Sequence, residues 1–141
     1  MPVRVSEVMD KDVPTVKPDM KLHDFVKFLV KHSIRFAPVV NEAGLVVGGI
    51  SETDLMKLIR VQPLPTVSAV WTNLPRNIGD KPISEVMNPR PITISERAEA
   101  IEALNMMNVA NVHILIVTDI NNNLAGLVRL RRILEKMLEK V

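Results

Sequence analysis

Two short polar side chains stand three residues apart in the segment GGISETDL, which covers residues 48–55. Ser51 and Asp54 follow an apolar run and precede a helical pattern, so we expect them where a strand gives way to a helix. There a serine oxygen can accept a hydrogen bond from a helix N–H, and an acidic side chain can reach back to complete a capping box. The same carboxylate can also accept hydrogen bonds from the vicinal hydroxyls of a ribose. The two roles are compatible.

Little else in the chain could carry out covalent chemistry. There is no cysteine, and the three histidines, His23, His32 and His113, lack the spacing of a metal site. No glycine-rich phosphate loop is present, and no sequence neighbour would activate Ser51 as a nucleophile. We therefore expect a binding protein and not an enzyme, with no metal and no cofactor.

The composition restricts the class of protein further. With 141 residues, 47% of them hydrophobic, the chain can bury one real core. No apolar run approaches the roughly 18 residues of a membrane span, and the N-terminus lacks the pattern of a signal peptide. A net charge of +2 and an aromatic content of 3% argue against nucleic acid as the main partner. We expect a cytoplasmic protein that does not bind membranes.

An internal repeat sets the architecture. The segment VSEVM at residues 5–9 returns as ISEVM at residues 83–87, and the two serines, Ser6 and Ser84, lie 84 − 6 = 78 residues apart. The same offset aligns IRFAPVV (34–40) with VHILIVT (112–118), and Gly48 with Gly126. An ungapped match of this length predicts two copies of one unit. We assign residues 1–60 to repeat 1, residues 61–80 to a proline-containing connector and residues 81–141 to repeat 2.

Each copy shows the same order of elements, β-α-β-β-α, which predicts an α+β fold. The extended pieces are 13–16 and 91–94, and the paired β-rich runs are 36–40 with 45–50 and 114–118 with 124–128. Helical spacing of apolar residues predicts buried faces on two helices and one apolar face on the last helix. These faces comprise Leu22, Phe25, Val26 and Leu29; Ile101, Leu104, Met106 and Met107; and Leu130, Ile133, Leu134, Met137, Leu138 and Val141. Trp71, in the connector, is expected to serve as a packing anchor.

On these repeated segments the chain resembles the CBS-domain family, as a tandem CBS pair or Bateman module, over essentially its whole length. The resemblance implies two three-stranded sheets packed back to back about a pseudo-twofold axis. It also implies two clefts between the copies, which in many members bind AMP, ADP or ATP and in some S-adenosylmethionine. Such modules act as sensors, usually attached to enzymes or transporters, and here we expect a stand-alone module. Family modules commonly pair into a flat disc, so a homodimer is expected.

The resemblance also implies a set of binding residues. Ser51 and Asp54 match the family's ribose-holding Ser/Thr-x-x-Asp motif. Arg35 and His113 occupy equivalent places in the two copies, and by analogy they face the central cleft, where they suit phosphate oxygens. A surface ion pair for Arg35 and a semi-buried structural role for His113 are the alternatives. The residues expected around the adenine are Gly49 and Ile50 from copy one with Pro91, Ile92 and Val112 from copy two.

Copy two lacks the ribose-holding pair. Arg129 stands opposite Ser51 and Arg132 opposite Asp54, and a guanidinium group cannot accept a hydrogen bond from a ribose hydroxyl. Either these arginines lie on a solvated face paired with Glu135, or they reach across to an anion, in which case Arg132 joins the ligand site. In both cases we expect one nucleotide per chain.

The expected function is therefore that of a regulatory adenine-nucleotide sensor with one principal ligand site. An S-adenosylmethionine-binding module would use the same Asp54 and need fewer phosphate donors. A nucleic-acid-binding or dimerisation protein is the alternative from another class. It would draw on the basic residues Arg129, Arg131, Arg132, Lys136 and Lys140.

Overall fold

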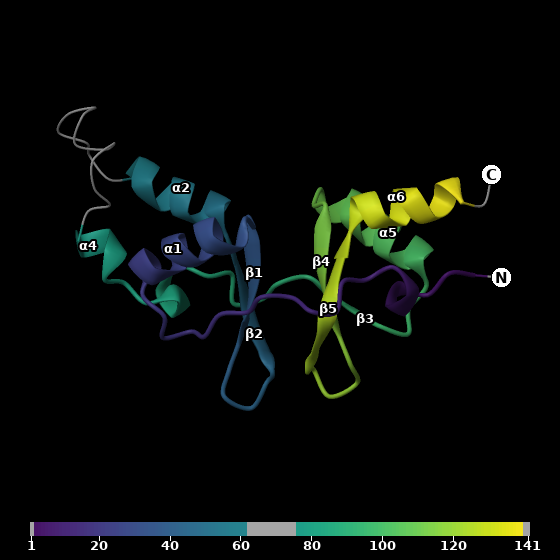
Figure 1. Ribbon diagram of the computed structural model, residues 1–141, viewed down its shortest axis with the longest axis horizontal. Helices are drawn as coiled ribbons and strands as arrows, with labels where there is room; N and C mark the ends of the chain where they lie inside the picture. Colours follow the sequence, from purple (N-terminus) through teal and green to yellow (C-terminus); the bar gives the residue numbers. More distant parts are fainter. Residues whose placement is uncertain (1, 62–75, 140–141) are drawn as a thin grey trace. The chain divides into compact units, whose positions relative to one another are not determined.

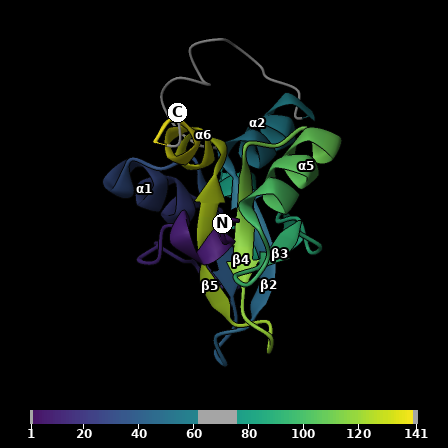
Figure 2. The same ribbon diagram turned by 90° about the vertical axis from the view of Figure 1, so that its right-hand side faces the viewer.

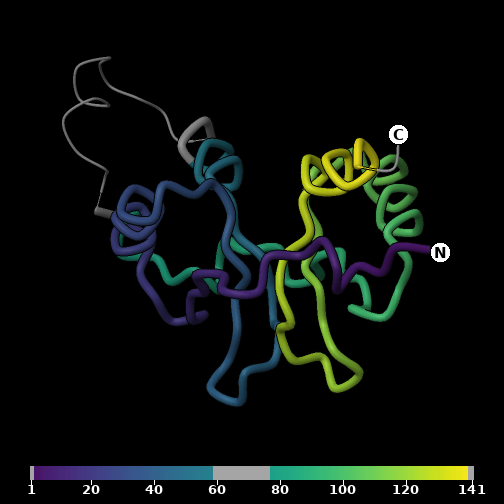
Figure 3. Tube along the Cα trace, turned by 45° about the vertical axis from the view of Figure 1, so that its right-hand side comes forward, coloured from purple at the N-terminus to yellow at the C-terminus, as the bar shows by residue number. Residues whose placement is uncertain are grey.

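The computed structural model describes residues 2–61 and 76–139, which form two compact units. Unit 1 combines Met1–Val13 and Gly44–Val46 with Pro91–Val141, and unit 2 combines Pro14–Ala43 with Val47–Arg90. Each unit therefore contains the helices and most of the hairpin of one sequence repeat. It also contains the first segment of the other repeat, which we call the head: residues 1–13 of repeat 1 and residues 81–90 of repeat 2. The chain can be followed through both units in Figure 3. No helix in the described ranges has the length and apolar character of a membrane span. Trp71 and Val141 lie outside the described residues.

Unit 2 is built around the hairpin of β1 (Phe36–Val40) and β2 (Val46–Ser51). The helices α1 (Leu22–His32) and α2 (Glu52–Val61) lie on the same side of this hairpin (Figure 1). The short helix α4 (Arg76–Gly79) and the 3₁₀ helix η2 (Ile83–Glu85) complete the unit. The expected third strand at 13–16 is reduced to a single parallel bridge between Val16 and Val39. Unit 2 thus has a two-stranded sheet in place of the three-stranded sheet that the family resemblance implied.

Unit 1 contains a three-stranded sheet in the order β3-β4-β5. Its strands are β3 (Thr93–Ser95), β4 (Ile114–Thr118) and β5 (Leu124–Arg129). β3 pairs in parallel with β4, and β4 pairs antiparallel with β5. The helices α5 (Ala100–Ala110) and α6 (Leu130–Leu138) lie on one side of the sheet, together with the 3₁₀ helix η1 (Val5–Glu7), as Figure 2 shows.

The helical faces agree with the sequence in unit 2 but not fully in unit 1. Leu22, Phe25 and Leu29 of α1 are buried in the core of unit 2, as predicted. In α5 the buried residues are instead Ala100, Ala103 and Met107, and Ile101 is 55% exposed. The prediction for Ile101 was wrong because the helix turns its small residues toward the sheet, and a residue one step on lies about 100° around the helix axis.

The head of each repeat pairs with a strand of the opposite repeat. In unit 1, Asp10 exchanges two main-chain hydrogen bonds with Leu127 of β5, with N···O distances of 2.7 and 3.0 Å. In unit 2, Asn88 does the same with Gly49 of β2, at 2.9 and 3.0 Å. Asn88 and Asp10 are equivalent under the 78-residue offset, so the two units are completed in the same way.

Glycines allow this pairing because the backbones approach closely. A Cβ placed on Gly126 would lie 2.3 Å from the carbonyl oxygen of Asp10, and one on Gly48 would lie 2.9 Å from that of Asn88. Both distances are shorter than any normal contact between a carbon and an oxygen atom. Any side chain at these two positions would push the head away from its strand.

The turns and helix ends repeat the same backbone conformations at the same offset. Ser33 and Asn111, which end α1 and α5, have φ values of 53° and 55°.

Between β4 and β5, the carboxylate of Asp119 accepts hydrogen bonds from the backbone N–H groups of Asn121 and Asn123. Hydrogen bonding by the backbone N–H of Asn123, and then by that of Asn121, lowers the pKa of Asp119 below its ordinary value.

We expect the substitution Gly126→Ala to destabilise the protein by about 1–3 kcal/mol, the usual range for overpacking. The added methyl group would collide with the Asp10 carbonyl and displace the head from β5. Urea unfolding would measure the change in free energy, and amide hydrogen exchange at Asp10 and Leu127 would localise it. Val109→Ala, at a side chain that is 89% exposed, is the control and should change stability by less than about 0.5 kcal/mol. Equal stability of Gly126→Ala and the wild type would contradict the close approach.

Candidate functional site

Ser51 and Asp54 lie at the junction of β2 and α2, as the sequence predicted, and form a complete capping box. The backbone N–H of Asp54 donates to Ser51 Oγ at 3.3 Å. In return, Asp54 Oδ2 accepts from the backbone N–H of Ser51 at 2.9 Å and from its hydroxyl at 3.2 Å. Both residues are half-buried. The structural role that the spacing suggested is therefore real, and it fixes the orientation of the carboxylate.

This cap occupies only part of the carboxylate. All the hydrogen bonds found for the Asp54 side chain within residues 2–61 and 76–139 go to Oδ2. An ionised carboxylate has about four acceptor positions, so Oδ1 has capacity for further donors. Because its partner oxygen is held by Ser51, Oδ1 is oriented in advance and not left to rotate freely. A pair of vicinal hydroxyl groups is a suitable donor for such an acceptor.

Arg35 lies next to this pair. Its carbonyl oxygen accepts the first N–H of α2, that of Glu52, at 2.9 Å. Its side chain is 88% exposed, and its Nε lies 3.8 Å from the Glu52 carboxylate. An ion pair this exposed contributes little to stability, so the guanidinium is available to an anion near the helix start. In unit 2, then, the structure brings Arg35, Ser51 and Asp54 together.

Gly49 and Ile50 precede Ser51 on β2, and their expected contact with an adenine stays a prediction. The N–H of Gly49 already donates to Asn88, whose own N–H donates to the Gly49 carbonyl. The Ile50 side chain has no exposed area and belongs to the core of unit 2. The two residues hold the strand beneath Ser51. Their expected contact with an adenine receives no support from exposed atoms of their own.

Asn88 is a neighbour of the site that the sequence did not suggest. It lies opposite Gly49 on the paired head, and its side-chain oxygen accepts the backbone N–H of Arg90 at 3.0 Å. The signal was present in the offset, because Asn88 is the counterpart of Asp10. The offset alone did not show that the head of one repeat pairs with a strand of the other repeat.

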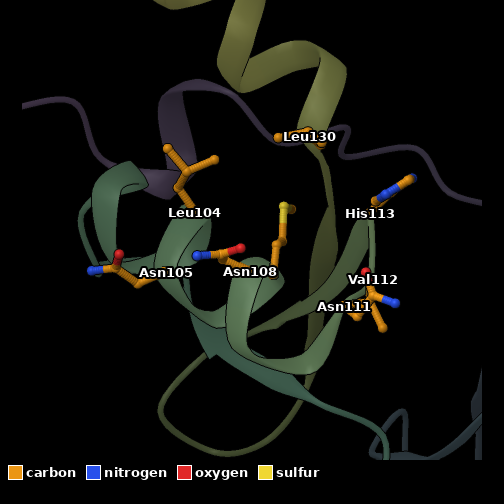
Figure 4. Close-up of a pocket in the computed structure, with 8 residues that line it drawn as sticks. Leu104, Asn105, Asn108, Asn111, Val112, His113 and Leu130 are labelled. Carbon is orange, nitrogen blue, oxygen red and sulfur yellow. The ribbon is translucent and has the colours of Figure 1, made fainter.

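Unit 1 holds the remaining predicted residues, and it brings only two of them together. A hollow with a volume of about 310 Å³ lies between α5, the residues before β4 and the start of α6 (Figure 4). Val112 and His113 border it, whereas Pro91, Ile92 and Arg132 are not among its lining residues. The full lining comprises Leu104, Asn105, Met107, Asn108, Asn111, Val112, His113 and Leu130. The lining thus combines apolar side chains with carboxamide groups and the imidazole of His113.

The start of α6 carries two ion pairs in place of the capping box. Arg129 donates to the carboxylate of Asp10, and Arg132 lies 3.3 Å from the Glu135 carboxylate. The pair between Arg132 and Glu135 confirms one of the two predicted arrangements for that arginine, while the pair with Asp10 was not foreseen. Within the described ranges, no three His, Cys, Asp or Glu side chains are grouped as a metal site would require.

Comparison with known proteins places the chain among relatives of similar length and among parts of larger enzymes. A CBS domain-containing protein of Dictyostelium discoideum is 32% identical over 151 residues, covering 100% of this chain and 97% of that protein. Inosine-5'-monophosphate dehydrogenase of Methanocaldococcus jannaschii is 29% identical over 133 residues. That match covers 94% of this chain but only 23% of the enzyme.

Two solved structures share the fold along the whole chain. CBSX2 in complex with AMP superposes with a TM-score of 0.81 at 20% identity, covering 98% of both chains. The CBS domain pair of protein MJ0100, in complex with 5'-methylthioadenosine and S-adenosyl-L-methionine, gives 0.76 at 23% identity over 100% of both chains. The family model described as CBS domain matches residues 5–61 and again residues 83–139. The chain thus belongs to the CBS-domain family, as a tandem pair of CBS domains.

Proposed function

We propose that this chain is a regulatory module that binds an adenine nucleotide at the junction of β2 and α2. The observation that carries the proposal is Asp54, whose Oδ2 is held by Ser51 while Oδ1 keeps its capacity to accept donors. The vicinal hydroxyl groups of a ribose supply two such donors at the right separation. AMP in the CBSX2 complex and the adenosine derivatives in the MJ0100 complex support this choice of ligand class.

In this proposal the residues of unit 2 have separate roles. Asp54 accepts the ribose hydroxyls, and Ser51 both caps the helix and orients the carboxylate. Arg35 supplies a cation for the phosphate, because its guanidinium is exposed beside the helix start. The helix end itself has fewer free donors than an uncapped one, since Arg35 and Ser51 already accept the N–H groups of Glu52 and Asp54.

The five residues of unit 1 that the resemblance implied at a ligand stay predictions. His113 and Arg132 are exposed, and Ile92 presents a side chain that is 38% exposed. Single substitutions at these residues and at Pro91 and Val112, measured with AMP and with adenosine, test them.

We expect Asp54→Ala to weaken the binding of AMP by about tenfold or more, because a charge-assisted hydrogen bond contributes about 1.5–3 kcal/mol. Isothermal titration calorimetry measures the affinity. Asp54→Asn separates the two roles of the residue, since an amide oxygen can still accept from Ser51 but carries no charge. Its affinity should fall while its melting temperature stays near that of the wild type. Asp24→Ala, at an exposed carboxylate on α1, is the control for the change in net charge. Unchanged affinity in a folded Asp54→Ala protein would reject the site.

A binder of S-adenosylmethionine is the second candidate, supported by the ligand of the MJ0100 complex. It would use Asp54 in the same way but would not need Arg35. A thermal-shift panel of AMP, ADP, ATP, S-adenosylmethionine and a single-stranded oligonucleotide distinguishes these cases, because a ligand of the folded state raises its melting temperature. We expect AMP, ADP or ATP to produce the largest shift and Arg35→Ala to reduce it. A shift with S-adenosylmethionine alone would favour the second candidate, and one with the oligonucleotide alone would reject both.

We also propose that the protein is a homodimer that uses the exposed face of α6. Leu134, Met137 and Leu138 are 47%, 51% and 72% exposed on this helix, so the predicted apolar stripe is largely uncovered within the chain. Contiguous apolar side chains on a helix are a common basis of self-association. Ile133 alone among the residues of α6 is buried in the unit itself.

Multi-angle light scattering at micromolar concentration should return twice the chain mass of 15.8 kDa. Leu134→Glu should shift the protein toward the monomer, because a buried unpaired carboxylate is costly at an interface. Ile120→Glu is the matched control, since Ile120 is 88% exposed in the β4–β5 turn and away from α6. A wild-type mass equal to that of one chain would contradict the dimer.

A further inference from the structure

The two units share one backbone frame around the strand-to-helix junction. In unit 2 the first N–H of α2, that of Glu52, donates to the carbonyl of Arg35 at 2.9 Å. In unit 1 the first N–H of α6, that of Leu130, donates to the carbonyl of His113, also at 2.9 Å. The paired heads add the equivalent bridges of Asn88 to Gly49 and of Asp10 to Leu127. What differs between the junctions is the set of side chains.

The paired head places Asp10 within reach of Arg129. Asp10 lies opposite Leu127 on β5, and Arg129 is two residues further along that strand, which makes it the diagonal neighbour of Asp10. Both main-chain groups of Asp10 are bonded to Leu127, so its carboxylate is held at this point. Arg129 donates to it, and both side chains are roughly two-fifths exposed. In unit 2 the same diagonal relates Asn88 to Ser51, and neither of these side chains is charged.

From these contacts we infer that the junction of unit 1 does not bind nucleosides, because its own side chains offer no acceptor for a ribose. Arg129 replaces the hydroxyl that orients the carboxylate, and Arg132 replaces the carboxylate itself, so no acceptor for ribose hydroxyls stands at either position. Asp10 and Glu135 neutralise these arginines, which would otherwise oppose the positive end of the α6 dipole. The chain therefore takes one nucleotide, and Asp10, Arg129 and Arg132 are the residues that determine this.

The inference rests on the proposed function, because it assumes that the shared frame accepts a nucleotide when it carries the side chains of unit 2. The direct test transfers those side chains to unit 1. The triple variant Asp10→Asn, Arg129→Ser, Arg132→Asp gives the junction of α6 the residues found at Asn88, Ser51 and Asp54. Its AMP stoichiometry is measured by calorimetry alongside that of the wild type, each also in the Asp54→Ala background.

The expected result is one AMP per wild-type chain, two per triple variant, and one per triple variant that also carries Asp54→Ala. Arg131→Ser removes a neighbouring positive charge on α6 and should leave the stoichiometry at one. A folded triple variant that still binds one AMP would overturn the inference. So would a wild-type stoichiometry of two with one site surviving Asp54→Ala, and this readout does not require the triple variant to fold.

The same measurements separate failure of the inference from failure of the proposed function. Loss of the single wild-type site in Asp54→Ala supports the proposed function whatever the triple variant does. If neither the wild type nor the triple variant binds AMP, both the proposed function and the inference are rejected. The main-chain arrangement that the two junctions share would then not be a nucleotide-binding one. Circular dichroism of each variant confirms that the fold is retained.

Discussion

The close approach of each repeat head to a strand of the opposite repeat is the constraint on which the rest of this structure depends. It requires glycine at positions 48 and 126, because the carbonyl of the facing residue occupies the space of a side chain. Main-chain hydrogen bonds then fix the facing residues, Asn88 and Asp10, in register with β2 and β5. The polar side chains of the heads come to lie beside the strand ends, where the two helices begin. The composition of each junction is thus set partly by residues far away in the sequence.

The two junctions share one main-chain hydrogen-bonding pattern but carry different side chains. At both junctions the first N–H of the helix donates to the carbonyl of the residue just before the neighbouring strand, Arg35 before β1 and His113 before β4. These hydrogen bonds join main-chain groups, so they do not depend on which side chains are present. The junction of α2 then carries a capped carboxylate, and the junction of α6 carries arginines compensated by Asp10 and Glu135. The two junctions therefore differ in charge and in hydrogen-bonding groups through only a few residues.

Much of the fold was predictable because hydrophobic periodicity and turn residues are local signals. The strands 36–40 and 114–118 begin and end where the sequence indicated. β2 begins and ends one residue later than expected, and β5 ends one residue later. The capping box of Ser51 and Asp54 was also predictable, since it depends on residues three apart. These features need no knowledge of what packs against them.

The features that were missed depend on tertiary contacts. The burial of Ala100 and Ala103 in place of Ile101 reflects how closely α5 packs on its sheet, which a count of apolar residues does not reveal. The offset of 78 residues identified Asp10 as the counterpart of Asn88. It did not reveal which strand a head joins, and so the ion pair with Arg129 was not predicted.

The discontinuous units impose an order on folding during synthesis. Unit 2 draws on residues up to Arg90, so it can close while the C-terminal third of the chain is still being made. Unit 1 needs the first thirteen residues and β5, whose contact between Asp10 and Leu127 spans most of the chain. The head of repeat 1 is made before the rest of unit 1 and is therefore among the last segments to find its partner. Closing so long a loop costs conformational entropy before any contact offsets it, which makes docking of the head a late step of folding.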